Sequence, residues 1–263
     1  MIGLERILRH ERAVVACGLV AVITLAWVNL WLGAGMGMSA LDMTTLSLFP
    51  HRDAGMGGSM ETSLLVVIFM WWVMMIAMMT PSAIPLVLLY GSVLRRHTPS
   101  AHRAYLSATV LLAGYLAAWL AFSVSAAVLQ KTLEPTGLIS EMMLWSRSAV
   151  LSASVLALAG IYQFSSIKHA CLAQCRSPVL FLTAHWRPGR RGAFLLGVRH
   201  GAFCVGCCWI MMALLFVGGI MNLVWIAALT LLVLAEKLLP AGAVVAKVSG
   251  ALMIIWAVAT LLV

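Results

Sequence analysis

Five of the six cysteines of this sequence lie within one stretch of 38 residues. Thiolate sulfur is a soft donor that favours Cu(I), zinc or iron–sulfur clusters over magnesium and calcium. One or two cysteines in an apolar chain are often simple packing residues, and Cys17 is interpreted in this way. Five cysteines so close together instead predict a soft-metal site. They are Cys171, Cys175, Cys204, Cys207 and Cys208.

The spacing of these cysteines is helical. One stripe, with steps of three or four residues, consists of His200, Cys204, Cys207, Cys208, Met211 and Met212. Such steps place side chains along one face of a helix. Cys171 and Cys175 are four residues apart and share a face if their segment is helical. We assign the thiols as metal ligands, and His169 and His200 as alternative ligands or as partners of the ligands.

Methionines form a second stripe within segment 64–80. The stripe includes Met75, Met78 and Met79, and it ends at Pro81. Thioether sulfur suits Cu(I), so these three methionines are predicted to pass an ion along as low-affinity ligands. The alternative is that methionine serves here only as a flexible core residue. The connection 33–63 carries five further methionines and could capture a soft cation outside.

The composition requires a lipid environment. Of 263 residues, 63% are apolar and 10% are charged, and the mean hydropathy is +1.04. Soluble domains are about half apolar and a quarter charged, so a soluble globule is excluded. The net charge of +9 is spread in short runs between apolar blocks, and we therefore expect no nucleic-acid partner.

Seven apolar blocks have about the length that spans a hydrocarbon core of ~30 Å. They are 13–32, 64–80, 104–129, 149–167, 201–219, 220–239 and 243–262. Each block is continuous rather than alternating, which indicates helices. The expected fold is an all-α, polytopic transmembrane bundle of about seven helices. Residues 1–63 form a retained signal-anchor helix and an external Met-rich loop, and 64–263 form a six-helix membrane domain with the Cys motifs.

The distribution of basic residues predicts the orientation. Fourteen Lys and Arg lie in the connections on one side and three in those on the other. By the positive-inside rule, the N-terminus is cytosolic and the C-terminus external. Segment 168–200 is then a cytosolic loop, with Lys168 and His169 at the interface and Arg199 at the start of the fifth helix. Cytosolic thiols stay reduced, which disfavours structural disulfides.

Two features near this face remain open. The 171–175 and 204–208 cysteines can share an ion only if the loop turns back toward the bilayer; otherwise there are two sites. Glu236 could neutralise Arg199 or His200 or receive a proton during transport. Alternatively, Glu236 and Lys237 extend to the headgroups.

The motifs resemble a bacterial family described as predicted metal-binding integral membrane proteins, whose domain has no assigned function. The resemblance covers roughly residues 64–250. It lies in segments 168–178 (KHACLAQCRSP), 201–209 (GAFCVGCCW), 221–225 (MNLVW), Glu236-Lys237 and 78–81 (MMTP). It implies a multi-pass protein of the bacterial inner (cytoplasmic) membrane that binds a metal and is associated with copper handling.

The leading hypothesis is Cu(I) transport or delivery to a cuproenzyme, with zinc or another soft metal as a less favoured ligand. The expected partners are the lipid bilayer, the metal ion and a copper chaperone or cuproenzyme. One alternative is a thiol oxidoreductase that exchanges electrons between Cys204-Val205-Gly206-Cys207 and a quinone. Another is a non-catalytic assembly subunit of a membrane complex. The sequence contains no hydrolase motif.

Overall fold

The computed structural model describes residues 2–33, 44, 62–97, 101–140 and 145–262, and for 2–14, 96–97 and 101–105 it describes the backbone alone. This part of the chain is helical apart from turns and one bridge between Ile139 and Ser146. Its elements are α1 (Ile2–Trp31), α2 (Leu64–His97), α3 (Ala101–Leu133), η1 (Glu134–Thr136), α4 (Ala149–Tyr162), α5 (Ser166–Arg176), α6 (Pro178–His185), α7 (Gly189–Ala213), α8 (Leu215–Gly218), α9 (Leu223–Leu238) and α10 (Gly242–Leu262).

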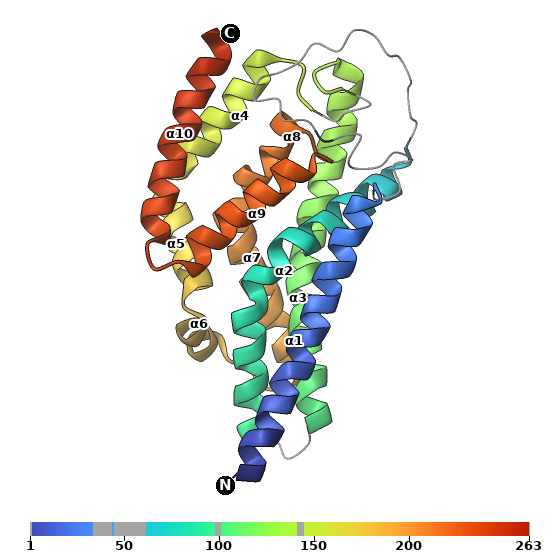
Figure 1. The fold of residues 1–263 in the computed structure, drawn as a ribbon, viewed down its shortest axis with the longest axis vertical. Coiled ribbons are helices and arrows are strands. Elements are labelled where there is room, and N and C mark those ends of the chain that lie inside the picture. The colour runs from blue at the N-terminus through green and yellow to red at the C-terminus, as the bar shows by residue number, and fades with distance from the viewer. Residues whose placement is uncertain (1, 34–43, 45–61, 98–100, 141–144, 263) are drawn as a thin grey trace.

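The helices form two groups with α9 between them (Figure 1). The long helices α1, α2 and α3 lie side by side, and α7 packs chiefly on α3. On the other flank α4 pairs with α10, and α5 continues below α4 to pack on α7. The largest core fills the space between α2, α3, α7 and α9 and is rich in methionine.

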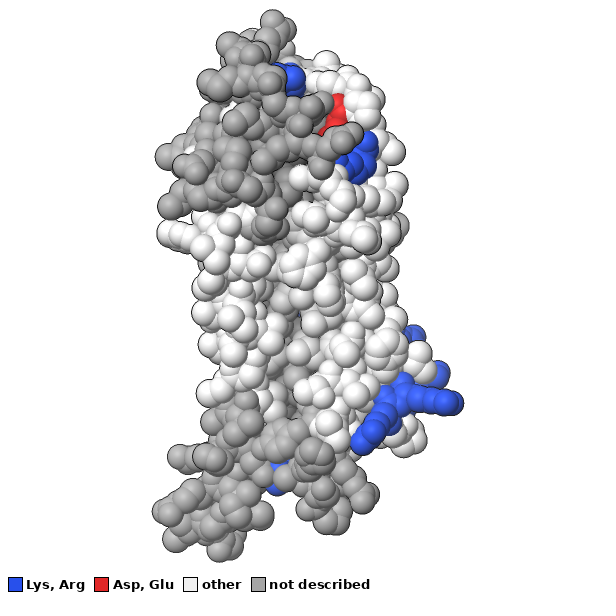
Figure 2. Space-filling view, turned by 90° about the vertical axis from the view of Figure 1, so that its right-hand side faces the viewer, with Lys and Arg blue, Asp and Glu red and all other residues white. Residues whose placement is uncertain are grey.

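The surface is charged mainly at its ends. On the face shown in Figure 2, the described Lys, Arg, Asp and Glu side chains lie near the two ends of the elongated body, and a broad uncharged belt separates them. Large apolar side chains are exposed along this body, as for Leu65, Ile161 and Leu231. An uncharged belt between charged ends is the surface that a bilayer solvates.

Four described spans are long and apolar enough to cross a membrane: Leu64–Arg95, Leu106–Thr136, Gly189–Gly218 and Gly242–Leu262. The bent pair α4 and α5 makes a fifth if it counts as one span. The all-helical prediction is therefore confirmed for the described residues. The number of seven crossings and the cytosolic N-terminus stay predictions. Each of the seven apolar blocks coincides with helix. However, the apolar part of α1, Val15–Trp31, and the 16-residue α9 are shorter than the four spans named above.

Two expected boundaries are wrong. The helix expected over 149–167 ends at Tyr162, and the chain bends by 65° before α5 begins. Segment 168–200, expected to be a loop, contains α5, α6 and the first half of α7, so Arg199 lies within a helix. The basic residues and two prolines of this segment indicated a loop. However, Pro178 occupies the first turn of α6, where a missing N–H costs nothing.

Helix α2 also extends further than its apolar block. It continues through Pro81 and Pro85 to His97. Each proline removes one backbone hydrogen bond, but neighbouring helices can satisfy the freed groups within a bundle. Between the two carbonyls that the prolines free, those of Ala77 and Pro81, the Met79 carbonyl accepts from Ser82 Oγ at 2.8 Å and from Tyr115 Oη at 2.9 Å. The prolines therefore lie within a continuous helix that faces the cysteines.

Glycines bring α3 and α7 into close contact. A Cβ atom on Gly197 would lie 2.0 Å from the Leu111 carbonyl oxygen, and one on Gly201 would lie 2.6 Å from Ala118 Cβ. On the facing helix, a Cβ on Gly114 would lie 2.2 Å from the Phe194 carbonyl oxygen. Small residues four apart let two helix backbones approach in this way. The close contact places α7 directly beside Tyr115.

A buried ion pair holds α5 against α9. Lys168 Nζ donates to Glu236 Oε2 at 2.7 Å, and neither side chain is more than 3% exposed. Lys168 also donates to Gln163 Oε1 and, at 3.2 Å, to Met211 Sδ. Gln163 Nε2 donates to Glu236 Oε1 at 2.8 Å and to Ser249 Oγ at 3.1 Å. The network joins the α4–α5 bend to α7, α9 and α10.

This pair corrects two expectations. Lys168 is fully buried between helices, and Glu236 pairs with Lys168 rather than with Arg199 or His200. The physical reason is the bend after Tyr162, which turns α5 inward. Ser165 caps the new helix by accepting from the Lys168 amide at 3.1 Å.

The α3–α7 contact is tested by Gly197→Ala. The added methyl group has no room against backbone, so we expect a loss of about 1–3 kcal/mol of stability from overpacking. Thermal unfolding of the detergent-solubilised protein measures it. Gly18→Ala on α1 is the matched control, because a Cβ there meets nothing within 4 Å. Equal melting temperatures for the two variants would contradict the close approach.

The ion pair is tested by Lys168→Met. Removing the lysine leaves Glu236 charged and unpaired in the interior, which costs about 3–5 kcal/mol. The double variant Lys168→Met/Glu236→Gln removes the charge and keeps an acceptor for Gln163, so it should recover most of the lost stability. Thermal unfolding checks both variants. A double variant no more stable than the single one would show that the pair is not the cause.

Candidate metal centre

Three buried thiols lie along one face of α7. Cys204, Cys207 and Cys208 are each 1% exposed, and their face turns toward the core. The three- and four-residue steps predicted this shared stripe, and the helix carries it as expected. The thiols of Cys207 and Cys208 donate to the Cys204 carbonyl oxygen at 3.1 and 2.8 Å.

Polar groups from three other helices surround Cys204 Sγ. Lys237 Nζ of α9 lies 2.8 Å from it, Tyr115 Oη of α3 lies 3.1 Å from it, and Ser82 Oγ of α2 lies 4.0 Å from it. Lys237 also donates to Ser82 Oγ at 3.3 Å. All four side chains are buried. The ammonium and the hydroxyl are both placed to donate hydrogen bonds to this sulfur.

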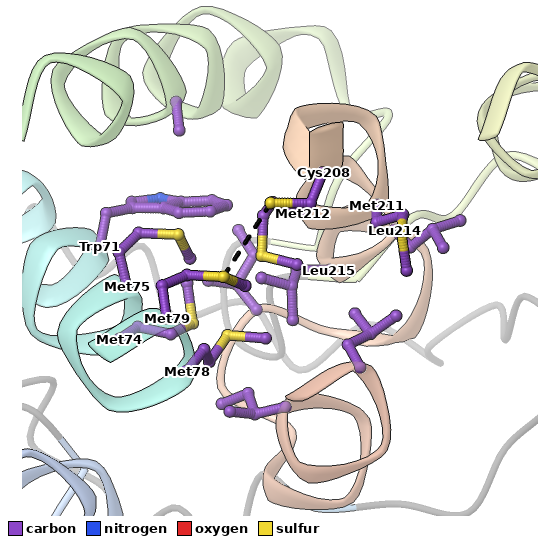
Figure 3. Packing of buried hydrophobic residues seen from close by; sticks show 14 of the residues in the cluster. Trp71, Met74, Met75, Met78, Met79, Cys208, Met211, Met212, Leu214 and Leu215 are labelled. Carbon is purple, nitrogen blue, oxygen red and sulfur yellow. Dashed lines mark hydrogen bonds between the residues drawn. The ribbon is translucent and has the colours of Figure 1, made fainter. Parts of the chain in front are cut away.

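The methionine stripe of α2 faces the thiols of α7. Met79 Sδ lies 4.0 Å from Cys208 Sγ, the contact drawn as a dashed line in Figure 3. In the same view Met75 and Met78 lie on the turns beside Met79 and face Met212 of α7. All of these methionines are fully buried. The α2–α7 contact is therefore a sulfur-rich, dry zone that continues from the cysteines.

The α5 thiols adjoin those of α7. Cys171 and Cys175 pack against the core cluster that contains Cys204, Cys207 and Cys208, and α5 packs on α7. Cys171 Sγ lies 3.0 Å from where a Cβ on Gly206 would be, so the glycine makes room for it. Tyr162 at the end of α4 donates to the Gly206 carbonyl. The bend of 65° after Tyr162 thus lays α5 and its two thiols against α7.

The two histidines occupy different places. His200, one turn before Cys204, is buried, and its ring lies 5.8 Å from that of Tyr115 and 5.0 Å from that of Phe181. Its Nδ1 is buried without a hydrogen-bond partner. His169 is half-buried on α5, about 100° around the helix from Lys168. Only His200 lies within the buried part of the site.

The thiols are close together but do not surround a common point. Among the described residues, no three His, Cys, Asp or Glu side chains form a group arranged to hold a metal ion. The bonds from Cys207 and Cys208 to the Cys204 carbonyl account for this, since they direct both thiols at their own helix. Rotation about χ1 frees both sulfurs, and the donor types present then suit a soft ion.

Sequence reasoning missed the polar groups that complete the site. The sequence pattern places Lys237 near the cytosolic face or at the headgroups, and it gives no indication of Tyr115 or Ser82. For Lys237 the sequence does contain a usable signal, because an ionisable residue at the end of an apolar block indicates a functional or paired group. Tyr115 had no such signal. The proposed external capture residues Met36, Met38, Met43, Met56 and Met60 lie outside the described residues.

Comparison with protein families identifies a relationship for most of the chain. A family described as a copper chaperone (PpoB2) matches residues 68–260, which include all of the thiols and methionines discussed above except Cys17 and those of the 33–63 connection. No curated protein and no solved structure matches the chain. Because the match covers well over half of its length, the chain belongs to this copper chaperone family.

Proposed function

We propose that this protein binds Cu(I) at its buried thiol cluster and delivers it across or from the bacterial inner membrane to a cuproenzyme. The observation that carries the proposal is the packing of Cys171 and Cys175 of α5 against the buried cluster that holds Cys204, Cys207 and Cys208 of α7. Membership of a copper chaperone family supports copper as the cargo. The ligands are Cys171, Cys175, Cys204, Cys207 and Cys208.

The donor set favours Cu(I) over zinc. Cu(I) accepts two or three soft sulfur ligands, whereas structural zinc sites use four ligands in a tetrahedron. Cys175 with either Cys204 or Cys207 supplies two thiolates from opposite helices. The site is closed to water, because the α7 thiols and Met79 are at most 1% exposed. A dry sulfur site also protects Cu(I) from oxidation and from competing oxygen ligands.

The burial of the sulfurs suggests an order of transfer. Cys171 and Cys175 are partly exposed on α5, whereas the α7 thiols are buried. An ion received at Cys171 can pass by ligand exchange to Cys175, then to Cys204 and Cys207. Cys208 and Met79, whose sulfurs are 4.0 Å apart, continue toward Met78 and Met75. The methionines bind weakly and therefore release the ion onward.

Lys237 has a specific part in this function. Its ammonium group lies against Cys204 Sγ and keeps that sulfur ready as a thiolate. The metal binds thiolate rather than thiol, so a preformed thiolate lowers the cost of binding. Once copper is bound, the lysine offsets the negative charge of a two-thiolate complex in the interior.

The cysteine assignment is tested by the triple variant Cys204→Ser/Cys207→Ser/Cys208→Ser. Loss of these thiolates should abolish copper co-purification, measured by elemental analysis of the protein expressed in copper-supplemented cells. Cys17→Ser is the matched control, because Cys17 is exposed on α1 far from the cluster in sequence. An unchanged copper stoichiometry in a folded triple variant would defeat the assignment. Absence of copper in the wild type together with reversible thiol oxidation would favour the oxidoreductase alternative.

The role of Lys237 is tested by Lys237→Met and Lys237→Arg. A hydrogen bond to a charged group contributes about 1.5–3 kcal/mol, so the methionine variant should bind Cu(I) roughly tenfold or more weakly. The arginine variant keeps the charge and should retain most of the affinity. Competition against a Cu(I) chelator measures both. Lys247→Met, at an exposed position on α10, serves as control, and equal affinity of both Lys237 variants would contradict the proposed role.

A further inference from the structure

An apolar groove separates α2 from α6, away from the thiol cluster. Its volume is about 520 Å³, and it is lined by Leu89, Val93, Val179, Leu182, Thr183 and Trp186. The ring of Trp186 packs on that of Tyr90 of α2, with the ring centroids 5.4 Å apart. Thr183 turns its hydroxyl to the carbonyls of Val179 and Leu180, so the lining presents little polar surface.

Three exposed arginines follow this groove directly in the chain. Arg187 comes next after Trp186, and Arg190 and Arg191 lie in the first turn of α7. Among the described side chains, the only carboxylates are those of Glu134 and Glu236, and each is paired with a lysine. No described carboxylate therefore neutralises the arginines. Figure 2 shows that basic side chains gather near one end of the body, beside the uncharged belt.

We propose that this groove and the three arginines bind one anionic phospholipid. The groove takes an acyl chain, and Arg187, Arg190 and Arg191 bind the headgroup phosphate. Tryptophan beside arginine at the edge of an apolar belt is typical of the headgroup level of a bilayer, and clustered basic residues there attract anionic lipids. The proposal does not depend on copper binding.

The lipid site also bears on α5. Only Ser177 separates α6 from the helix that carries Cys171 and Cys175, and α5 and α6 are in contact. An acyl chain held between α2 and α6 therefore restrains α5, the helix that carries the partly exposed thiols. Arg176, the last residue of α5, also restrains this helix by donating to the carbonyls of Leu239 and Pro240 at 2.9 and 2.8 Å.

The test uses the full chain in nanodiscs of equal phosphatidylglycerol and phosphatidylcholine, followed by extraction and native mass spectrometry. The wild type should retain one phosphatidylglycerol in clear preference to phosphatidylcholine. Each arginine removed should reduce that preference roughly fivefold, so Arg187→Gln/Arg190→Gln/Arg191→Gln should abolish it. Arg147→Gln, at an exposed position outside this region, is the control and should keep the preference.

A second variant separates the groove from general attraction to anionic lipid. Thr183→Trp fills the groove from an exposed position and should prevent retention of the lipid. Leu180→Trp lies on the same helix, is also exposed and does not line the groove, so retention should be unchanged. Equal retention of the two lipids by the wild type overturns the proposal. Full retention by the triple arginine variant or by Thr183→Trp overturns it as well.

Discussion

The low dielectric constant of the interior is the constraint on which the structure depends. Charged groups there are stable only in pairs, and this chain buries two lysines. Lys168 pairs with Glu236 and thereby holds α5 against α7 and α9. Lys237, the next residue after Glu236, turns to Cys204 instead. One turn of α9 thus holds α5, which bears two thiols, and also supplies the cation beside a third thiol. The helix packing and the chemistry of the site therefore depend on the same requirement for charge compensation.

Close packing of the α3 and α7 backbones fixes the positions of the side chains in the site, which charge pairing alone does not. Gly197 and Gly201 let α7 approach α3 until their atoms touch, and this contact brings Tyr115 Oη within 3.1 Å of Cys204 Sγ. The same hydroxyl bonds the Met79 carbonyl and so fixes α2 beside the cluster. Four helices meet at one sulfur atom as a result. A chaperone must hold its cargo and then release it, and a site assembled from several helices can change its ligands when one helix moves.

The chemistry of the site follows from its mixed donors. In the proposed function, thiolates bind the ion tightly and the adjoining thioethers bind it weakly, so we expect the affinity to fall along the contact between α2 and α7. The partly exposed thiols of α5 lie at one end of this sequence of donors. The family match to a copper chaperone is consistent with such a gradient, which suits delivery better than permanent storage.

The sequence by itself determined the helical class, the membrane-compatible composition and the stripes of cysteine and methionine, because hydropathy and a period of 3.6 residues are local properties. It also indicated copper chemistry, since donor softness depends on residue type alone. Only the tertiary structure decided that the chain bends by 65° after Tyr162, that Lys168 points inward to Glu236, and that Tyr115, Ser82 and Lys237 surround Cys204. These contacts join residues up to 155 positions apart, as in the bond from Lys237 to Ser82. Local patterns carry no information about such pairs, because their geometry is set by how whole helices pack.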